Sequence, residues 1–238
     1  MIEVPSPNHE PRKDDAAVDI LLLHYTGMES GGGALERLCD PAAKVSAHYL
    51  IEEDGRVFHL VAEHRRAWHA GLACWAGERD VNSRSIGIEL VNPGHAFGYR
   101  PFPEAQMQAL IALCRGILAR HPIPPHRVLA HSDVAPARKQ DPGELFDWQR
   151  LAAAGIGVWP SGAEEVKAVP PISWFLGGLT RFGYCAPDGE RSETATEQVL
   201  AAFQRHFRPD SVTGRPDAGT AARLKGLLAF LDRGAETP

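Results

Sequence analysis

The chain has 238 residues, of which 44% are hydrophobic and 23% are charged, as is ordinary for a globular protein. Its formal net charge of -5 argues against nucleic acid or an anionic membrane surface as the main partner. No apolar run approaches the roughly 20 residues that a membrane helix needs. The amino terminus lacks the basic-then-apolar order of a secretion signal, so we expect a cytoplasmic protein. A trimmed chain from the periplasm or the envelope would look the same.

Four cysteines are spread along the chain without any Cys-x-x-Cys pair: Cys39, Cys74, Cys114 and Cys185. This spacing argues against a structural zinc knot and against a thioredoxin-type redox motif. We therefore expect the cysteines to be small buried side chains that stay reduced in the cytosol.

Residues 1–17 are rich in proline and charge, which predicts an extended arm. The short apolar run at 18–23 is typical of a strand buried on both faces. This strand ends at His24, and open α/β sheets usually bind their ligands at the carboxyl ends of the strands. Four further segments are expected to form one short helix and three strands, in this order: 31–39, 45–51, 56–61 and 85–91.

Glu89 is the single charge among the aliphatic residues of the strand at 85–91. An unpaired buried carboxylate is costly, so Glu89 needs a partner, a cavity or a metal nearby. Residues 103–120 are the clearest helix, because apolar residues recur there at three- and four-residue spacing. A last strand at 127–130 leads the chain into a polar loop at 130–143.

The composition changes after a helix expected at 144–154. We predict a first α/β domain at 18–160, a linker at 161–171 rich in Gly, Pro, Ser and charge, and a small helical domain at 172–238. Three helices are expected in that last domain, near the following positions: 172–183, 193–207 and 217–232. About 65 residues is marginal for an independent core, so we expect these helices to lean on the first domain.

The loop at 130–143 carries one histidine, two aspartates, a lysine and an arginine between prolines and a glycine. It is too polar for a buried strand and its composition is wrong for a helix, so we predict a loop, where functional groups are often placed. His131 and Asp141 from this loop, with His24, would leave a fourth tetrahedral position open, as in catalytic zinc sites. Asp133 is the competing carboxylate, and it could instead brace the loop.

A hydrolytic zinc site also needs a base that handles protons and a cation or donor that steadies an oxyanion. Glu89 fits the first role and Lys139 fits the second. The alternative is that the same residues form only a satisfied polar network. The following histidines are expected to be surface or packing residues: His9, His59, His64, His95, His121, His126 and His206.

Five motifs then occur in order along the chain: His24-Tyr25-Thr26, Ser46-Ala47-His48-Tyr49-Leu50-Ile51, Ala67-Trp68-His69-Ala70-Gly71, Ser85-Ile86-Gly87-Ile88-Glu89, and His131-Ser132-Asp133 through Asp141-Pro142-Gly143. Together they resemble the zinc-dependent N-acetylmuramoyl-L-alanine amidases of the AmpD/AmiD type. That superfamily also includes amidase-type phage lysozymes and peptidoglycan recognition proteins. The resemblance covers residues 18–155.

This resemblance implies a mixed β-sheet flanked by helices, with one zinc ion per chain at the carboxyl ends of the strands. By motif position, His24, His131 and Asp141 would be the zinc ligands. Glu89 would be the catalytic acid/base, and Lys139 would stabilise the tetrahedral intermediate.

Four further residues are candidates for substrate binding. Trp68, His69 and Arg138 could line the groove for the glycopeptide, with packing and surface roles as the alternative. His48 is expected to be a structural histidine near the site, with contact to the substrate as its alternative role.

The C-terminal part resembles a small helical peptidoglycan-binding domain through residues 199–204 and 213–217, although it could be only a structural buttress. The resemblances imply hydrolysis of the amide between the lactyl group of N-acetylmuramic (or anhydro-muramic) acid and L-alanine of the stem peptide, in cell-wall turnover or recycling. Muropeptides or peptidoglycan would then be the partners. The alternatives are a non-catalytic peptidoglycan-recognition module and a zinc peptidase that cuts within the stem peptide.

Overall fold

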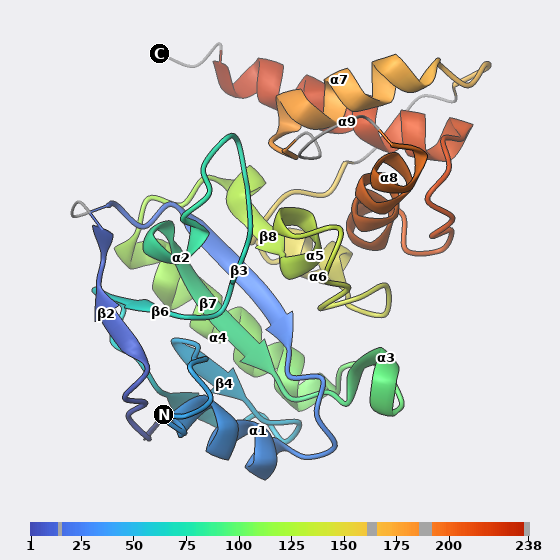
Figure 1. The fold of residues 1–238 in the computed structure, drawn as a ribbon. Helices are drawn as coiled ribbons and strands as arrows, with labels where there is room; N and C mark the ends of the chain where they lie inside the picture. Colours follow the sequence, from blue (N-terminus) through green and yellow to red (C-terminus); the bar gives the residue numbers. More distant parts are fainter. Residues whose placement is uncertain (14–15, 161–165, 186–191, 236–238) are drawn as a thin grey trace.

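The structure, a computed structural model, describes residues 1–13, 16–160, 166–185 and 192–235 (Figure 1). Its centre is a six-stranded mixed sheet with the strand order β1-β5-β4-β7-β3-β8. The strands are β1 (Ile2–Glu3), β3 (Ile20–Tyr25), β4 (Tyr49–Ile51), β5 (Val57–His59), β7 (Ser85–Leu90) and β8 (Val128–Ala130). A second, two-stranded antiparallel sheet pairs β2 (His9–Pro11) with β6 (Arg65–Ala67).

Helices flank the sheet and then form the C-terminal part of the chain. Those within the first part are α1 (Gly31–Cys39), α2 (Val81–Arg84), α3 (Gly94–Phe97), α4 (Glu104–Arg120), the 3-10 helix η2 (Pro125–Arg127), α5 (His131–Val134) and α6 (Trp148–Ala153). Three more follow, namely α7 (Ile172–Phe182), α8 (Glu193–Phe207) and α9 (Ala218–Ala235). The predicted α/β architecture, a mixed sheet flanked by helices with a helical C-terminal region, is confirmed.

The N-terminal arm is extended and paired with the rest of the fold, because β1 pairs in parallel with β5 and β2 pairs with β6. One local prediction needs correction. The polar loop does not begin as a loop, because residues 131–134 form the single helical turn α5 directly after β8. Asp133 stabilises this turn, since its Oδ2 accepts a hydrogen bond from the backbone N–H of Ala130 at 2.8 Å.

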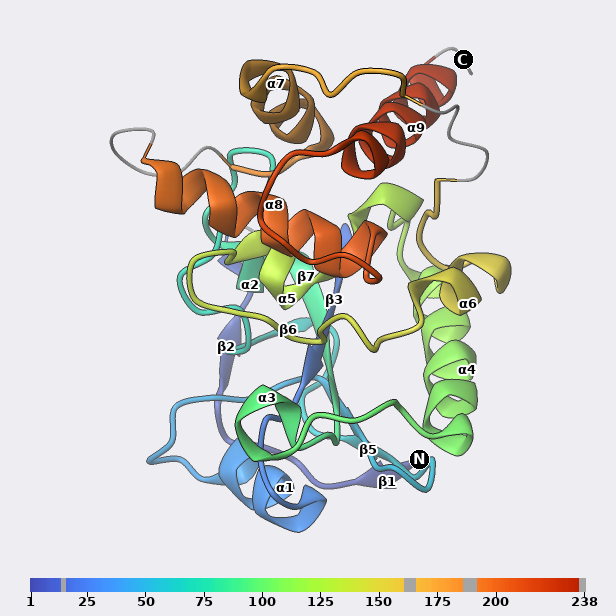
Figure 2. The same ribbon diagram turned by 90° about the vertical axis from the view of Figure 1, so that its right-hand side faces the viewer.

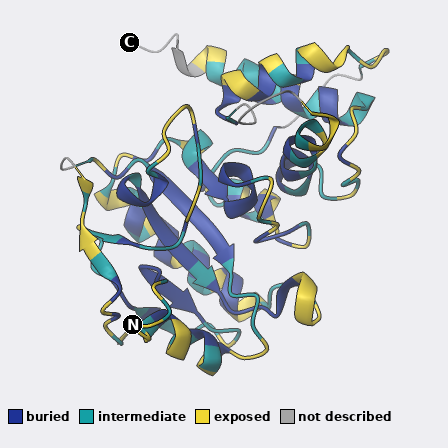
Figure 3. Ribbon diagram, viewed as in Figure 1, coloured by how far each residue is buried: buried dark blue, intermediate teal, exposed yellow. Residues whose placement is uncertain are grey.

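Side chains of β3 alternate between the two faces of the sheet. Leu21 and Leu23 belong to a core with α4, whereas Leu22 belongs to a core on the opposite face. His24 is two residues after Leu22 and therefore lies on the same face of the sheet, away from α4. Glu89 in β7 is the parallel-register partner of His24 and therefore shares that face. Figure 3 shows the strands that carry both residues largely in the colour of buried residues.

The C-terminal helices pack onto the face of the sheet that carries His24. In Figures 1 and 2, α8 lies between α5 and the pair α7 and α9. One continuous core joins side chains of the sheet and its α5 turn to side chains of these helices, and it includes Leu22, Leu129, Val134, Phe175, Leu179 and Phe203. The helical part therefore leans on the first domain, as its small size leads one to expect.

Asp133 connects the two parts through a buried polar cluster. Its Oδ1 accepts a hydrogen bond from the Tyr184 hydroxyl at 2.5 Å, and its Oδ2 lies 2.6 Å from Nδ1 of His206. All three residues are buried. Asp133 is thus a brace, and His206 is a packing residue, but both belong to a contact between domains that local sequence patterns do not indicate.

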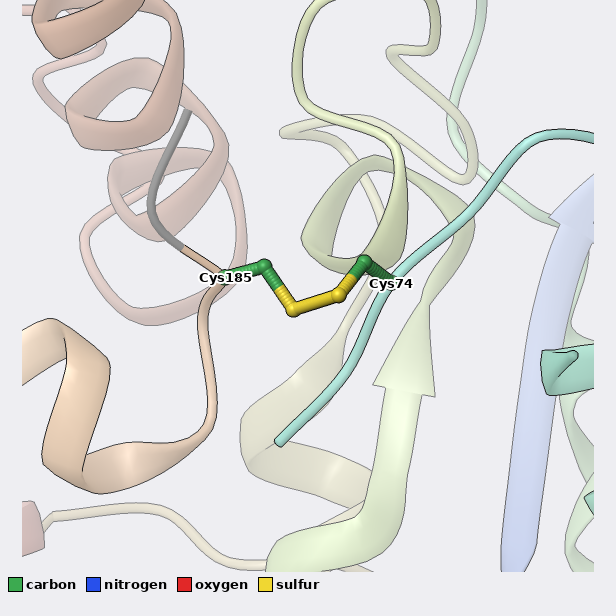
Figure 4. The surroundings of a disulfide bond; sticks show 2 residues. All are labelled: Cys74 and Cys185. Atoms are coloured by element: carbon green, nitrogen blue, oxygen red, sulfur yellow. A yellow bond between two sulfur atoms is a disulfide. The ribbon is translucent and has the colours of Figure 1, made fainter. Parts of the chain in front are cut away.

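A disulfide bond joins Cys74 to Cys185 and links the same two parts of the chain (Figure 4). The expectation that all four cysteines stay reduced is therefore wrong for these two. The sequence gives no local signal for the pair, because its members are 111 residues apart and meet only when the C-terminal helices dock. Cys39 and Cys114 are free; Cys114 is buried on the apolar face of α4 as expected, and Cys39 is half-buried.

The domain limits at 160 and 171 stay a prediction, and residues 161–165 of the expected linker lie outside the described residues. None of the helices in the described ranges is long and apolar enough to cross a membrane.

Replacing Asp133 tests whether the buried cluster holds the two parts together. We expect Asp133→Ala to lower the free energy of unfolding by about 3–5 kcal/mol, because it leaves Tyr184 and His206 buried without their partner. The matched control is Asp232→Ala, which removes an exposed ion pair with Arg181 and should cost at most about 1 kcal/mol. Denaturant unfolding measures both, and equal effects of the two substitutions would contradict the assigned brace.

Candidate metal centre and active site

The fold brings the three predicted metal ligands together. His24 lies near the end of β3, and His131 opens α5 directly after β8, the parallel neighbour of β3. Asp141 follows in the same polar segment. Nδ1 of His24 lies 2.9 Å from Nδ1 of His131 and 3.2 Å from Oδ2 of Asp141, and the remaining side of the triangle, His131 Nδ1 to Asp141 Oδ2, is 3.0 Å. All three side chains are buried, so they form a compact donor set that could hold a metal ion.

The protons on the imidazoles support this interpretation. Nε2 of His131 lies 3.0 Å from the carbonyl oxygen of Ala70, which can only accept, so Nε2 carries a proton and a neutral His131 would present a lone pair on Nδ1. Burial, and then the facing His131, lower the pKa of His24 to about 4, so His24 is neutral at pH 7. With both rings neutral, as metal binding requires, three acceptor atoms would converge in a buried place, where a cation at their centre is favourable.

Glu89 lies beside this donor set, on the neighbouring strand at the register position of His24. Its Oε2 is buried and has no hydrogen-bond partner among the described residues. Burial, and then the negative charge of Asp141, raise the pKa of Glu89 well above its ordinary value, while Lys139 acts in the opposite direction. A raised pKa brings a carboxyl group closer to the pH at which it can both take and give a proton, as a general acid/base must.

These groups open into one cavity of about 520 Å³. Its wall includes the following predicted site residues: Trp68, His69, Glu89, His131, Arg138, Lys139 and Asp141. The wall therefore carries carboxyl, imidazole, ammonium and guanidinium groups together with an indole surface. Such a mixture suits a polar ligand that is bound in a defined orientation.

The candidate substrate-binding residues fall into different positions. Trp68 lies on the cavity wall without any hydrogen bond from its indole among the described contacts. Arg138 is exposed, and its guanidinium donates to the carbonyl oxygens of Ala70 and Leu72. His48 is fully buried and is not part of this wall; its Nδ1 accepts from the backbone N–H of Gly87 at 3.0 Å. The position of His48 agrees with a structural role.

His69 does more than line the cavity, because its Nδ1 lies 3.0 Å from Nε2 of His24. The segment that carries it is held by Asn82, whose Oδ1 accepts from the backbone N–H groups of His69 and Ala70. Sequence reasoning missed Asn82 and the carbonyl of Ala70. A backbone carbonyl has no residue signature, and the only available signal was the Trp68–Gly71 motif itself.

The family model for N-acetylmuramoyl-L-alanine amidases matches residues 14–144 of this chain. The chain belongs to the N-acetylmuramoyl-L-alanine amidase family. It is thus an enzyme of the class that the five sequence motifs indicate, and that resemblance is confirmed. The model for a peptidoglycan binding domain matches residues 174–224, which agrees with the weaker resemblance of the C-terminal part.

Individual relatives show the same similarity over nearly the whole chain. The chain is 39% identical to the N-acetylmuramoyl-L-alanine amidase AmiD of Escherichia coli strain K12, over 89% of this chain and 82% of that protein. The structure of AmiD in complex with the substrate anhydro-N-acetylmuramic acid-L-Ala-D-gamma-Glu-L-Lys superimposes with a TM-score of 0.81, at 38% identity over 92% of each chain. AMPDH3 from Pseudomonas aeruginosa, in complex with anhydromuramic pentapeptide, gives 0.83 at 36% identity, over 90% of this chain and 92% of that chain.

The buried carboxyl of Glu89 predicts a pH-dependent stability of the metal-free protein. Because its pKa is raised on folding, its stabilisation is complete below the unfolded pKa near 4.3 and is lost as the pH rises through the folded pKa. We expect Glu89→Gln, which cannot ionise, to be more stable than the wild type at pH 7 by at least about 1.4 kcal/mol, the free energy of one pKa unit. The advantage should shrink toward pH 4.

Denaturant unfolding of chelator-treated protein at the two pH values measures this difference. Glu53→Gln is the matched control, because Glu53 forms an ion pair with Arg100 at the surface. An advantage of Glu89→Gln that is the same at pH 4 and pH 7 would show that folding does not raise the pKa of Glu89.

Proposed function

We propose that this amidase hydrolyses the amide between the lactyl group of N-acetylmuramic or anhydro-muramic acid and L-alanine of peptidoglycan stem peptides, with a zinc ion held by His24, His131 and Asp141. The observation that carries the proposal is the convergence of these three acceptor atoms beside the buried carboxyl of Glu89. The anhydromuramyl peptides bound to the AmiD and AMPDH3 structures support the same substrate class for this chain.

The donor set fits zinc in its chemistry and its size. Two imidazole nitrogens and one carboxylate oxygen are ligands that zinc commonly takes, and three protein ligands leave a position for water or substrate. Zinc bonds of about 2.0–2.1 Å in a tetrahedron place neighbouring ligand atoms about 3.3 Å apart. The observed separations, between 2.9 and 3.2 Å, are close to this value. A bound zinc ion would polarise the scissile carbonyl and make hydroxide available near neutral pH.

We assign the proton transfers to Glu89. Its carboxylate would take a proton from the attacking water and return it to the leaving amine, a sequence that its raised pKa favours. The ammonium group of Lys139, on the wall of the same cavity, would stabilise the negative charge that develops on the carbonyl oxygen. Trp68 and Arg138 would contact the glycopeptide from that wall. We do not assign His69 to substrate binding, because its Nδ1 contacts the proposed zinc ligand His24.

Substitution of Glu89 tests its catalytic role. We expect Glu89→Gln to lower kcat by about 10²- to 10⁴-fold, the usual contribution of a general acid/base, and to keep zinc bound. Turnover of an anhydro-muropeptide and the zinc content of the same sample measure the two effects. Glu53→Gln should keep wild-type turnover. Wild-type turnover in zinc-loaded Glu89→Gln would contradict the assignment, and a chelator should abolish the activity of the wild type until zinc is restored.

Product analysis separates the amidase from a peptidase that cuts within the stem peptide. Mass spectrometry of an anhydro-muropeptide digest should find the intact peptide beginning with L-alanine, together with the free sugar acid. Peptides cut between their amino acids would contradict the proposal. A parallel digest of polymeric peptidoglycan shows whether the enzyme acts on the intact wall or on recycled fragments.

The disulfide bears on the compartment. A cytoplasmic location was expected from the sequence, with the periplasm or envelope as the alternative. Disulfides persist in oxidising compartments and are rare in the cytosol, so the bond between Cys74 and Cys185 favours the periplasm or envelope. We propose that the chain acts there.

Loss of this disulfide should weaken the protein measurably. We expect Cys185→Ser to lower the free energy of unfolding by about 2–4 kcal/mol, because the bond restricts the unfolded chain. A reductant should lower wild-type stability by a similar amount and leave Cys185→Ser unchanged, and Cys39→Ser is the matched control. Alkylation of thiols in the native host shows whether Cys74 and Cys185 are oxidised in the cell. Free thiols at these two positions would contradict the proposed location.

A further inference from the structure

The two imidazoles of the metal centre are held in different ways at their outer nitrogens. Nε2 of His131 faces the carbonyl oxygen of Ala70, which can only accept a hydrogen bond. Nε2 of His24 instead faces Nδ1 of His69 at 3.0 Å. An imidazole nitrogen can donate or accept, so this contact does not by itself decide which nitrogen of His24 carries the proton. The choice matters, because a proton on Nδ1 of His24 would occupy the place of a metal.

The contacts of the other ring nitrogen of His69, Nε2, determine which nitrogen of His24 carries the proton. Its Nε2 lies 3.3 Å from Oγ of Ser85, and the same Oγ lies 2.6 Å from the carbonyl oxygen of Val81. The carbonyl can only accept, so the single hydroxyl proton of Ser85 is donated to Val81. Oγ of Ser85 then accepts from Nε2–H of His69.

The remaining hydrogen bonds of this series can be assigned because a neutral imidazole ring carries one proton. With its proton on Nε2, His69 has a bare Nδ1, which accepts from Nε2–H of His24. His24 is left with a lone pair on Nδ1, which faces His131 and Asp141. The carbonyl of Val81 thus orients two imidazoles in succession, through a hydroxyl group.

The fold keeps the His69 ring in place for this purpose. Gly87 in β7 lies next to the ring, and a Cβ at that position would come within 2.5 Å of Cγ of His69. A neutral ring with one proton is what the hydrogen-bond chain requires.

We propose that His69 is a positioning residue, which holds His24 in the tautomer whose Nδ1 lone pair faces the metal, and that Ser85 sets the tautomer of His69. The inference rests on the proposed metal site. It gives His69 a different role from the contact with the glycopeptide that its sequence motif predicts. Partners of this kind orient metal-binding imidazoles, and their loss typically weakens metal affinity about 10- to 100-fold.

Zinc affinity of the variants tests the proposal. We expect His69→Ala to raise the Kd for zinc about 10- to 100-fold in a competition with a chromogenic chelator. His69→Asn should recover part of this loss, because its Oδ1 can replace the accepting Nδ1. Ser85→Ala should give a smaller loss, since it leaves His69 free to change tautomer. His64→Ala, at an exposed histidine outside the chain of hydrogen bonds, should bind zinc like the wild type.

The tautomers themselves can be read by ¹⁵N NMR of the imidazoles in the metal-free protein. We expect His24 and His69 to carry their protons on Nε2 in the wild type and a mixture for His69 in Ser85→Ala. This measurement needs no bound zinc, so it distinguishes failure of the positioning role from failure of the zinc proposal. Wild-type zinc affinity in His69→Ala with a raised KM for a muropeptide would overturn the inference and identify His69 as a substrate contact.

Discussion

The active site depends on the convergence of three buried side chains, those of His24, His131 and Asp141. Nδ1 of His24, Nδ1 of His131 and Oδ2 of Asp141 lie between 2.9 and 3.2 Å from one another. Such a group is unfavourable unless a cation compensates it or a proton is drawn in. The surrounding groups orient both rings, since Ala70 and His69 face their outer nitrogens. These three side chains could hold a metal ion, which would supply a positive charge at this point.

Strand register places Glu89, the proposed acid/base, beside these three atoms. His24 and Glu89 are partners on neighbouring parallel strands, and both lie on the face away from α4. Because side chains alternate along a strand, a slip of one residue would turn either group into the core with α4. The aliphatic residues that precede them, such as Leu23 and Ile88, fix the register by their burial. The packing of the core thus determines where the side chains of His24 and Glu89 lie. Gly87, which has no side chain, leaves space for the ring of His69.

The sequence predicted the features that depend on local pattern. The apolar run before His24, the lone charge at Glu89 and the polar segment from His131 to Asp141 were each visible in a short stretch, and ordered motifs supplied the family. What remained hidden depends on segments that meet only in three dimensions. Local patterns do not indicate that Asp133 binds Tyr184 and His206, or that two cysteines 111 residues apart pair. The polar composition of residues 130–143 predicted a loop, whereas Asp133 stabilises the helical turn α5 by accepting from the backbone N–H of Ala130.

The helical part meets the active site through two separate contacts. It binds Asp133, which belongs to the same helical turn as His131, and its Cys185 holds Cys74, which follows the Ala70 carbonyl along the chain. Both contacts lie close to His131, the proposed metal ligand. One is made by the helical turn that begins at His131, and the other by the segment whose Ala70 carbonyl faces Nε2 of His131. A domain that only carried a binding surface would need neither. The C-terminal helices therefore complete the support of His131, whether or not they also bind the glycan.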